Sequence, residues 1–381
     1  MTMKVYFDNA ATTSMDPEVL EAMIPFLENK FGNPSSIHSY GRETRAAIEG
    51  ARKNIAELIN VSPGEIFFTS GGTEANNTAI RCGIEKLGIK HAVSSTIEHH
   101  AVSHTLEDIK SKGDLKLSWV KFKEDGHVDL EHLENLLRDN SRTLVSLMHA
   151  NNEIGNLLPL KKVSELCQKY DAILHSDTVQ TMGHYVHDMQ DVNLHFANCS
   201  AHKFHGPKGI GFMYINGDVK IDPFITGGSQ ERNMRGGTEN LYGIVGMAKA
   251  FEIAHRNMER DQNYIQGLKT YMAELLKTCI PGVKFNGDHD KSSLYTVLSV
   301  SLPPMTNGEM LLFNLDISGI AASGGSACTS GSNQGSHVLQ GIDCDMSRPS
   351  IRFSFSKENT KEEIDYAVKK LCEFIELSNK S

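Results

Sequence analysis

The residue with the clearest chemical character is Cys328, which lies in the segment SGGSACTSGSN at residues 323–333. Glycine, serine, alanine, threonine and asparagine surround this thiol, so no neighbour in sequence is large and apolar enough to bury it. A free cysteine usually packs as a small hydrophobic residue, whereas a nucleophilic one needs exposure and surroundings that favour the thiolate. The segment is therefore either a glycine-rich turn with an incidental cysteine or a loop that carries a nucleophile.

A second stretch with chemical potential is FFTSGGTEANN, where a strand-like run meets a helical pattern. Glycines let backbone amides approach a ligand, and the unpaired N–H groups at a helix N-terminus favour an anion. The stretch therefore predicts a phosphate site at Gly72 and Thr73, although a Gly-Gly turn before a helix is more often only a tight connection.

Polar residues also follow two further strand-like runs. Asp177 and Gln180 lie in AILHSDTVQ, and a carboxylate at the carboxyl end of a parallel strand lies where such folds bind ligands. The alternative for Asp177 is a structural salt bridge, because an isolated buried charge is costly.

Lys203 follows the next run, in NCSAHKFHGPKG, between Ser200, His202 and His205. Desolvation or nearby cations would lower the pKa of this amine and make it nucleophilic.

These three features, taken in chain order, fit one cofactor. Pyridoxal phosphate needs an anion site for its phosphate, a carboxylate for its pyridinium nitrogen and a lysine for its aldehyde. Each feature alone is a weak signal, whereas the ordered set predicts pyridoxal 5'-phosphate.

Composition sets the broad class of the protein. The chain has 381 residues, of which 39% are hydrophobic and 22% charged, as in ordinary globular proteins. Its formal charge of −9 argues against direct nucleic-acid binding. We find neither an apolar run long enough for a membrane span nor a secretory signal in MTMKVYFDNAATT, and therefore expect a cytoplasmic protein. The seven cysteines form no CxxC pair, which predicts neither a disulfide framework nor a metal site.

The elements that must position these residues read as an α/β fold. Strand-like runs alternate with helical patterns, which predicts a largely parallel sheet covered on both faces. The runs are EIFFTS, HAVSST, LKLSWVKF, TLVSLMHA, AILHSD, LHFANCS and GIGFMYI. After residue 240 the pattern becomes that of a smaller α+β domain. We divide the chain into an N-terminal segment 1–15, a helix over 16–30 that is a candidate member of the smaller domain, a large domain 31–255 and a small domain 256–381 with the Cys328 loop.

Motifs along nearly the whole chain resemble the cysteine desulfurases of the NifS and IscS type, in the class V aminotransferase superfamily. In order, they are YFDNAATT, FGNPSS, TSGGTEANN, TIEHHAV, HANNEIG, HSDTVQ, SAHKFHGPKG, RGGTEN, SGGSACTS and SIRFSFS. The resemblance implies fold type I of the pyridoxal phosphate enzymes, with a mostly parallel seven-stranded sheet between helices and a smaller α+β domain.

The resemblance also implies roles for individual residues. Lys203 would bind the cofactor covalently, Asp177 would keep the pyridine nitrogen protonated, and His99 would stack on the ring and help to move protons. The remaining residues would bind groups at the edge of the cofactor or the substrate: Asn152 and Gln180 the ring hydroxyl; Gly72, Thr73, Ser200 and His202 the phosphate; Thr238 the phosphate of the other subunit; Arg352, with Asn152, the substrate. Cys328 matches the persulfide-forming cysteine.

The implied reaction converts L-cysteine to L-alanine and leaves the sulfur as a persulfide on Cys328. The implied partners are a second copy of the chain and acceptor proteins for iron–sulfur clusters, other sulfur-containing cofactors or tRNA thiolation. Three alternatives remain at this point: a class V aminotransferase, which has no use for Cys328; a selenocysteine lyase; and a non-catalytic scaffold or sulfur carrier, which would not need Lys203 and Asp177.

Overall fold

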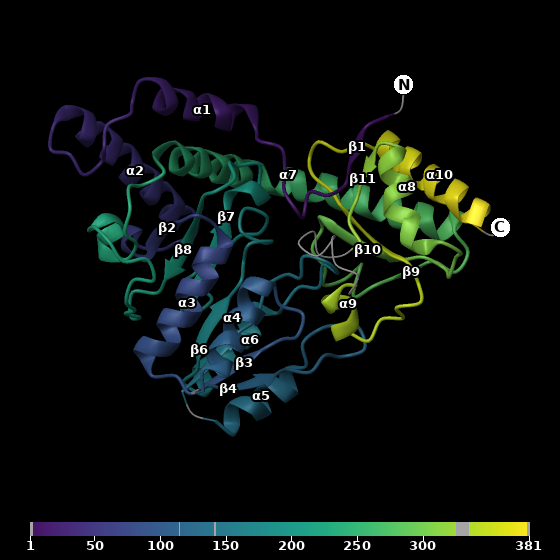
Figure 1. Ribbon diagram of the computed structural model, residues 1–381, viewed down its shortest axis with the longest axis horizontal. Helices are drawn as coiled ribbons and strands as arrows, with labels where there is room; N and C mark the ends of the chain where they lie inside the picture. The colour runs from purple at the N-terminus through teal and green to yellow at the C-terminus, as the bar shows by residue number, and fades with distance from the viewer. Residues whose placement is uncertain (1–2, 114, 141, 325–334, 379–381) are drawn as a thin grey trace.

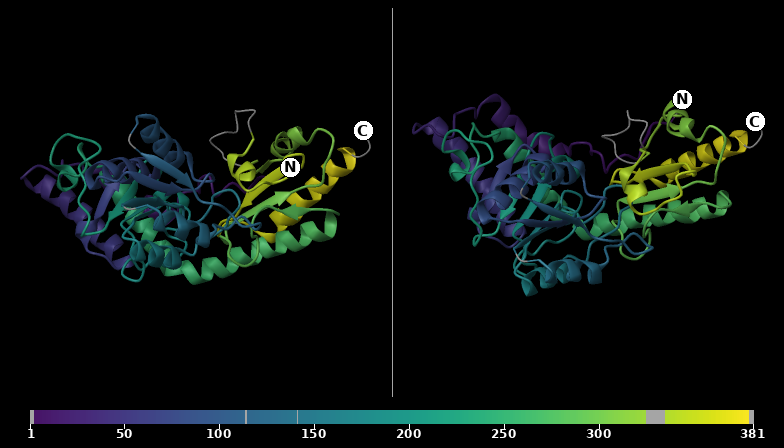
Figure 2. Two further views of the ribbon diagram at one scale, coloured as in Figure 1. Left: turned by 90° about the horizontal axis from the view of Figure 1, so that it is seen from below. Right: turned by 60° about the horizontal axis from the view of Figure 1, so that its bottom comes forward.

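The computed structural model describes residues 3–113, 115–140, 142–324 and 335–378. Figure 1 shows a larger α/β domain and a smaller C-terminal domain, and the long helix α7 (Leu241–Cys279) runs beneath both in Figure 2. The active-site candidates come from both domains, so the relation between the domains is as important as either core.

The larger domain is built on a seven-stranded sheet with the order β2–β8–β7–β6–β5–β3–β4. Its strands are β2 (Ile66–Thr69), β3 (His91–Ser94), β4 (Lys116–Trp119), β5 (Thr143–Ser146), β6 (Ile173–Ser176), β7 (Phe196–Ser200) and β8 (Gly211–Ile215). Neighbours from β7 to β4 pair in parallel, whereas β8 is antiparallel to both β7 and β2. Each of the seven strand-like runs in the sequence forms one of these strands, and the predicted fold class is confirmed.

Helices cover both faces of this sheet, which explains why most of its strands are apolar on both sides. The helices of the larger domain are α1 (Pro17–Glu28), α2 (Ser39–Leu58), α3 (Gly72–Leu87), α4 (His100–Ser111), α5 (Leu130–Arg138) and α6 (Leu160–Lys169). One hydrophobic cluster joins α1, α2, α5, α6 and the first half of α7 to the sheet. Two further clusters join α3 and α4 to the strands from the other side.

The position of α1 differs from the expectation that this helix is a candidate member of the smaller domain. The helix begins as its sequence indicates, because Asp16 accepts a hydrogen bond from the backbone N–H of Glu18 at 3.0 Å. Its buried residues Val19 and Met23 belong to the core of the larger domain. Gly246 of α7 permits this contact, since a Cβ there would lie 2.5 Å from the sulfur of Met23.

The smaller domain combines a three-stranded antiparallel sheet, β12–β10–β9, with helices and a two-stranded pair. Its elements are β9 (Lys284–Phe285), β10 (Val297–Ser301), α8 (Leu311–Ile317), β11 (Ile320–Ala321), α9 (His337–Gly341), β12 (Ser350–Ser354) and α10 (Lys361–Ser378). The N-terminal strand β1 (Val5–Tyr6) pairs in parallel with β11. The chain therefore starts in the smaller domain and then crosses to the larger one.

Helix α7 changes its partners along its length. Phe251 and Ile253 pack in the core of the larger domain, whereas Ile265 and Leu268 pack in the core of the smaller one. The boundary that we drew after residue 255 thus falls within an unbroken helix of 39 residues. Within the described residues, we find no helix that is both long and apolar enough to span a bilayer.

Candidate active site

A cavity of about 260 Å³ lies between the domains, at the carboxyl ends of the parallel strands. Open α/β sheets place ligands at this edge. The predicted site residues that line the cavity are Gly72, Thr73, His99, Asn152, Asp177, Gln180, Ser200, His202, Lys203 and Arg352. Of the other two, Thr238 lies elsewhere and Cys328 lies outside the described residues.

The phosphate-site candidate is the turn that leads from β2 into α3. Gly71 has φ +148°, a conformation that favours glycine, and no side chain caps the N-terminus of α3. A Cβ on Gly72 would lie 2.6 Å from Cγ2 of Val179, so a larger residue here would require the Val179 side chain to shift. The N-terminus of this 16-residue helix therefore borders the cavity at Gly72 and Thr73 without a side-chain cap, which suits a phosphate.

Asp177 lies at the end of β6 and is only 6% exposed. One carboxylate oxygen accepts a hydrogen bond from Nδ2 of Asn76 at 2.7 Å, and the other accepts the backbone N–H of Val179 at 3.0 Å. Asn198 on β7 in turn donates to Asn76 at 2.5 Å. These hydrogen bonds hold the carboxylate in a fixed position at the wall of the cavity. Our sequence analysis missed Asn76, although it lies in the quoted TSGGTEANN motif, one helical turn beyond Gly72.

Lys203 ends a short 3₁₀ turn, Ala201–Lys203, directly after β7. Its Nζ donates hydrogen bonds to the carbonyl oxygens of Ala10 at 2.6 Å and Ala11 at 2.9 Å. Gln180 also donates to the Ala10 carbonyl, at 3.1 Å. The N-terminal DNAATT segment therefore holds the amine at the wall of the cavity, beside Asp177.

The two predicted histidines are held as neutral rings. His99 caps the N-terminus of α4, where its Nδ1 accepts the backbone N–H of Ala101 at 3.1 Å. Burial lowers the pKa of His99, so at neutral pH the ring carries its proton on Nε2. Burial and the neighbouring Lys203 lower the pKa of His202 to about 4. The Nδ1 of His202 lies 3.2 Å from the hydroxyl of Thr12.

Arg352 on β12 provides the cationic wall, and its side chain is 2% exposed. Its Nη1 donates to the carbonyl oxygen of Asn152 at 2.9 Å, and its Nη2 donates to Asp8 at 2.7 Å. Its Nε is buried and has no hydrogen-bond partner among the described residues. A buried donor without a partner is costly, which indicates that a ligand acceptor belongs here. Asp8, in the YFDNAATT motif, is a second residue that our sequence analysis missed.

Thr238 lines a separate cavity of about 200 Å³ with Ser70, Gly209 and Arg235. Glu74 links this cavity to the phosphate turn, because it accepts a hydrogen bond from the Ser70 N–H at 2.9 Å and pairs with Arg235 at 3.0 Å. Within this chain, Thr238 is therefore a neighbour of the turn and not part of the main cavity.

The cysteines within the described residues differ from one another in exposure. Burial raises the pKa of Cys82 to about 11 and that of Cys167 to about 12, and raises the pKa of Cys199 well above its ordinary value. These three thiols are protonated and inaccessible, whereas Cys279 is exposed at the end of α7. The described ranges also contain no group of three or more histidine, cysteine or acidic residues that could hold a metal ion.

The chain matches the family model described as aminotransferase class-V over residues 5–367. It belongs to this family. Among relatives, it is 42% identical over 387 residues to a cysteine desulfurase IscS of Clostridium botulinum, covering 98% of this chain and 95% of the relative. It is also 42% identical over 380 residues to a cysteine desulfurase IscS of Dictyoglomus turgidum, covering 99% and 95%.

Solved structures of family members agree with this assignment. A NifS-like protein superimposes with a TM-score of 0.91 at 38% identity, covering 98% of this chain and 100% of that structure. SspA in complex with cysteine superimposes with a TM-score of 0.81 at 29% identity, covering 94% and 100%. Both the sequence relatives and the structures therefore place the chain among the cysteine desulfurase-like members of the family.

Proposed function

We propose that the protein is a pyridoxal phosphate-dependent cysteine desulfurase that converts L-cysteine to L-alanine and carries the sulfur as a persulfide on Cys328. The observation that carries the proposal is that Lys203, Asp177 and Arg352 meet in one cavity, with the buried Nε of Arg352 lacking an acceptor. The relatives named above support the same reaction, and SspA was solved with cysteine bound.

The residues present fit the cofactor. The uncapped N-terminus of α3, with Thr73, would bind the phosphate, and Asp177 would pair with the ring nitrogen. His99 would lie against the ring, and Lys203 would bind the aldehyde carbon. When bound, pyridoxal phosphate supplies an electron-accepting ring that stabilises negative charge at the Cα of the substrate.

The side chains of this protein bind the substrate, transfer its protons and accept its sulfur. Arg352 binds the substrate carboxylate through Nε, which is buried without a partner among the described residues, while one N–H of each terminal nitrogen anchors the guanidinium to Asn152 and Asp8. Lys203 takes the proton from Cα, and a neutral His99 holds a proton on Nε2 facing the same space. The Cys328 thiolate attacks the substrate sulfur, so that L-cysteine and the Cys328 thiol yield L-alanine and a Cys328 persulfide.

The protein is further proposed to act as a homodimer in the cytoplasm and to deliver sulfur to acceptor proteins. Thr238 lies on the other side of the phosphate turn from the main cavity, so it would reach a phosphate only in a second copy. Large apolar side chains also remain exposed on α1, on the segment after it and at the start of α2, which is typical of an interaction surface. They are Leu20, Leu27, Phe31, Ile37 and Tyr40.

The decisive experiment supplies L-cysteine to the purified protein and measures alanine and, with reductant, sulfide. After one turnover without reductant, mass spectrometry should find one added sulfur on the peptide that contains Cys328. Cys328→Ser should keep the cofactor absorbance and release no alanine at a useful rate, because a hydroxyl is a poor sulfur acceptor.

Cys279→Ser is the matched control, since Cys279 is an exposed thiol at the end of α7 that does not line the candidate active site. It should keep full activity. Transamination of a keto acid without sulfide release would instead identify an aminotransferase. Full alanine production by Cys328→Ser, or a persulfide found only on another cysteine, would remove the proposed role of Cys328.

A further inference from the structure

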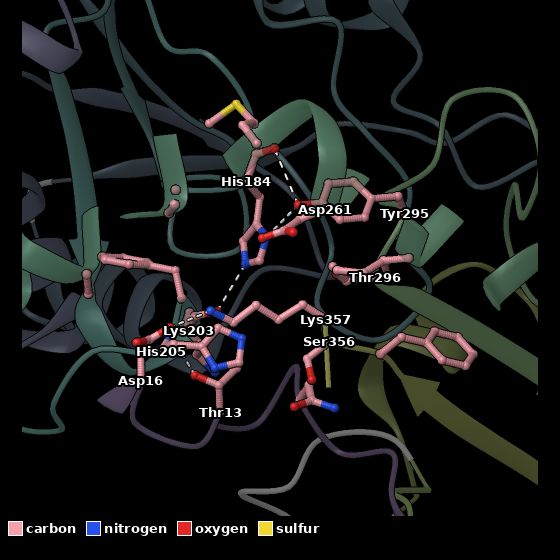
Figure 3. Close-up of a pocket in the computed structure, with 18 of the residues that line it drawn as sticks. Thr13, Asp16, His184, Lys203, His205, Asp261, Tyr295, Thr296, Ser356 and Lys357 are labelled. Carbon is pink, nitrogen blue, oxygen red and sulfur yellow. Dashed lines mark hydrogen bonds and ion pairs between the residues drawn. The ribbon is translucent and has the colours of Figure 1, made fainter. Parts of the chain in front are cut away.

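A second, smaller cavity of about 40 Å³ is also lined by Lys203, and Figure 3 shows the residues around it. Lys203 lines both cavities, so it borders the candidate active site as well as this space. The walls come from both domains, with Phe204 and Ala250 on one side and Tyr295 and Phe355 on the other. The proposed function gives no role to these four apolar or aromatic side chains.

A chain of two hydrogen bonds crosses this region and ends on Lys203. The Nε2 of His184 lies 3.0 Å from the backbone carbonyl oxygen of Lys203. The Nδ1 of His184 lies 2.7 Å from the hydroxyl of Tyr295. A carbonyl can only accept, so His184 donates from Nε2, and its bare Nδ1 accepts the proton of the tyrosine hydroxyl.

The surroundings of His184 maintain this arrangement. Burial lowers the pKa of His184 to about 4, so the ring is neutral near pH 7 and has one N–H to donate. The charged and titratable neighbours that influence it are His205 and Asp261. Gln262 of α7 donates to the backbone carbonyl of His184 at 2.5 Å, which fixes the turn that carries the ring.

Tyr295 connects these two hydrogen bonds to the sheet that carries Arg352. Its ring belongs to the core of the smaller domain, and β10 begins two residues later. In the pairing of β10 with β12, Ser299 lies opposite Arg352. The hydrogen bonds therefore run from the sheet that carries Arg352 to the turn that carries Lys203, across the boundary between the domains.

We propose that His184 and Tyr295 are positioning residues, which set the distance and direction of Lys203 relative to the sheet that presents Arg352. The inference rests on the proposed function, in which a substrate bound by Arg352 gives up its Cα proton to Lys203. A displacement of about 1 Å between reacting groups can cost about 100-fold in rate, so a contact that spans the two walls has a direct catalytic effect. Neither residue needs to touch the substrate for this role.

One other contact between the domains lies near the same turn but acts less directly. Lys357 pairs with Asp16 at 2.5 Å, and the N–H of Asp16 donates to the carbonyl of His205 at 3.0 Å. This pair reaches the residue two positions beyond Lys203. His184, by contrast, touches Lys203 itself, which makes it the better target for a test.

The test compares Tyr295→Phe with Tyr366→Phe in the full-length protein with cofactor. Tyr366 is the matched control, because its hydroxyl donates to the Ser318 carbonyl at 2.8 Å within the smaller domain. Amide hydrogen exchange in the peptide 196–206 should be about 10-fold faster in Tyr295→Phe and unchanged in Tyr366→Phe. In the same variant, kcat for L-cysteine should fall about 10-fold while KM stays within about 2-fold.

A conservative variant separates positioning from simple loss of stability. His184→Gln keeps an N–H near the position of Nε2 and should recover most of the kcat that His184→Ala loses. Unchanged exchange and kcat in Tyr295→Phe, or equal effects in both tyrosine variants, would overturn the inference.

Borohydride reduction of the wild type distinguishes failure of the positioning role from failure of the proposed function. If reduction labels Lys203 but Tyr295→Phe has no effect, only the positioning role falls. If reduction does not label Lys203, the proposed function falls, and the exchange experiment still decides whether His184 and Tyr295 fix the turn.

Discussion

The two walls of the candidate active site are built in different ways. The larger domain presents Asp177 and Lys203 from the ends of adjacent strands, beside the N-terminus of α3. Asp177 is fixed by partners within that same domain. Arg352, in contrast, extends from the sheet of the smaller domain to the carbonyl of Asn152 in the larger one.

This difference separates two tasks. The part of the cofactor wall around Asp177 can form when the larger domain folds, because Asp177 and its partners Asn76 and Val179 all lie in that domain. The Lys203 amine also depends on the N-terminal segment, through the Ala10 and Ala11 carbonyls. The substrate wall depends on how the domains are placed relative to each other, because Arg352 and its partner Asn152 lie on opposite sides of the boundary. We therefore expect changes in the cofactor wall to reduce the chemical step and changes in the substrate wall to act mainly on substrate binding.

The largest effect should come from Lys203→Ala in the cofactor wall. Removal of the amine abolishes covalent attachment of the cofactor and proton transfer at Cα, so turnover should fall at least about 10⁴-fold. Absorbance and borohydride labelling of the purified variant measure the first loss, and alanine release measures the second. Lys208→Ala, five residues further along the chain, is the control and should keep both; labelling of a different lysine in the wild type would contradict the assignment.

The next largest effect should come from Asp177→Asn. The amide keeps the shape of the side chain but only one of its two acceptor oxygens, so it loses one of the hydrogen bonds from Asn76 and Val179. It also removes the charge that would hold a pyridine nitrogen protonated, so kcat should fall about 10²- to 10³-fold with the cofactor still bound. Steady-state kinetics and cofactor absorbance test this together. Asp188→Asn serves as a control at an exposed acid, and a near-normal kcat in Asp177→Asn would refute the role.

A smaller effect, on binding, should come from Arg352→Lys in the substrate wall. Lysine keeps the charge but loses the planar fork that lets one guanidinium bind Asn152, Asp8 and a carboxylate at once. We expect KM for L-cysteine to rise about 10- to 100-fold and kcat to change less. Arg348→Lys, which alters a neighbouring arginine that bonds Ser301, should change KM little. A fall confined to kcat would contradict the expectation that changes in the substrate wall act mainly on substrate binding.

The smallest expected effect concerns the stability of the larger domain. It appears only when the pH is lowered below neutrality. Burial lowers the pKa of several histidines of this domain far below the value of about 6.5 expected in an unfolded chain. Four of them are His149, with a pKa of about 3, and His175, His184 and His187, with pKa values of about 4. Between pH 6.5 and 4 the unfolded chain therefore binds more protons than the folded one, so stability is full above about pH 6.5 and decreases as the pH falls.

Thermal unfolding measured at several pH values tests this expectation. Tm should fall by roughly 10 °C between pH 7 and pH 5. His149→Gln should show a shallower dependence on pH even if its Tm at pH 7 is lower. An identical slope in that variant would contradict the assignment of the effect to buried histidines.

Much of the fold was predictable because the signals are local. Each strand of the large sheet is a short apolar run bounded by polar residues, and a strand buried on both faces has this appearance in sequence. The helix over 16–30 was harder to place. Its capping by Asp16 is a local feature, whereas its packing against Gly246 depends on a contact more than 200 residues away.

Site residues could likewise be predicted only where their signal is local in the sequence. Lys203, Asp177 and Thr73 could be predicted because each follows a strand or begins a helix. Asp8 and Asn76 were missed, since their importance comes from Arg352 and Asp177, which are distant in sequence. The roles carried over from the resemblance, among them those of Thr238 and Cys328, remain predictions that the experiments above address.

The unbroken helix α7 has a consequence for engineering and for evolution. A helix of 39 residues is about 58 Å long, and here it contributes to two hydrophobic cores in succession. Exchange of the smaller domain between family members would require a junction within the helix, and the register of every later side chain would depend on that junction. An insertion of a single residue would rotate the donor domain by about 100° around the axis. Chimeras of this protein should therefore tolerate substitutions along α7 far better than insertions or deletions, so the two domains are better regarded as parts of one inherited unit than as exchangeable modules.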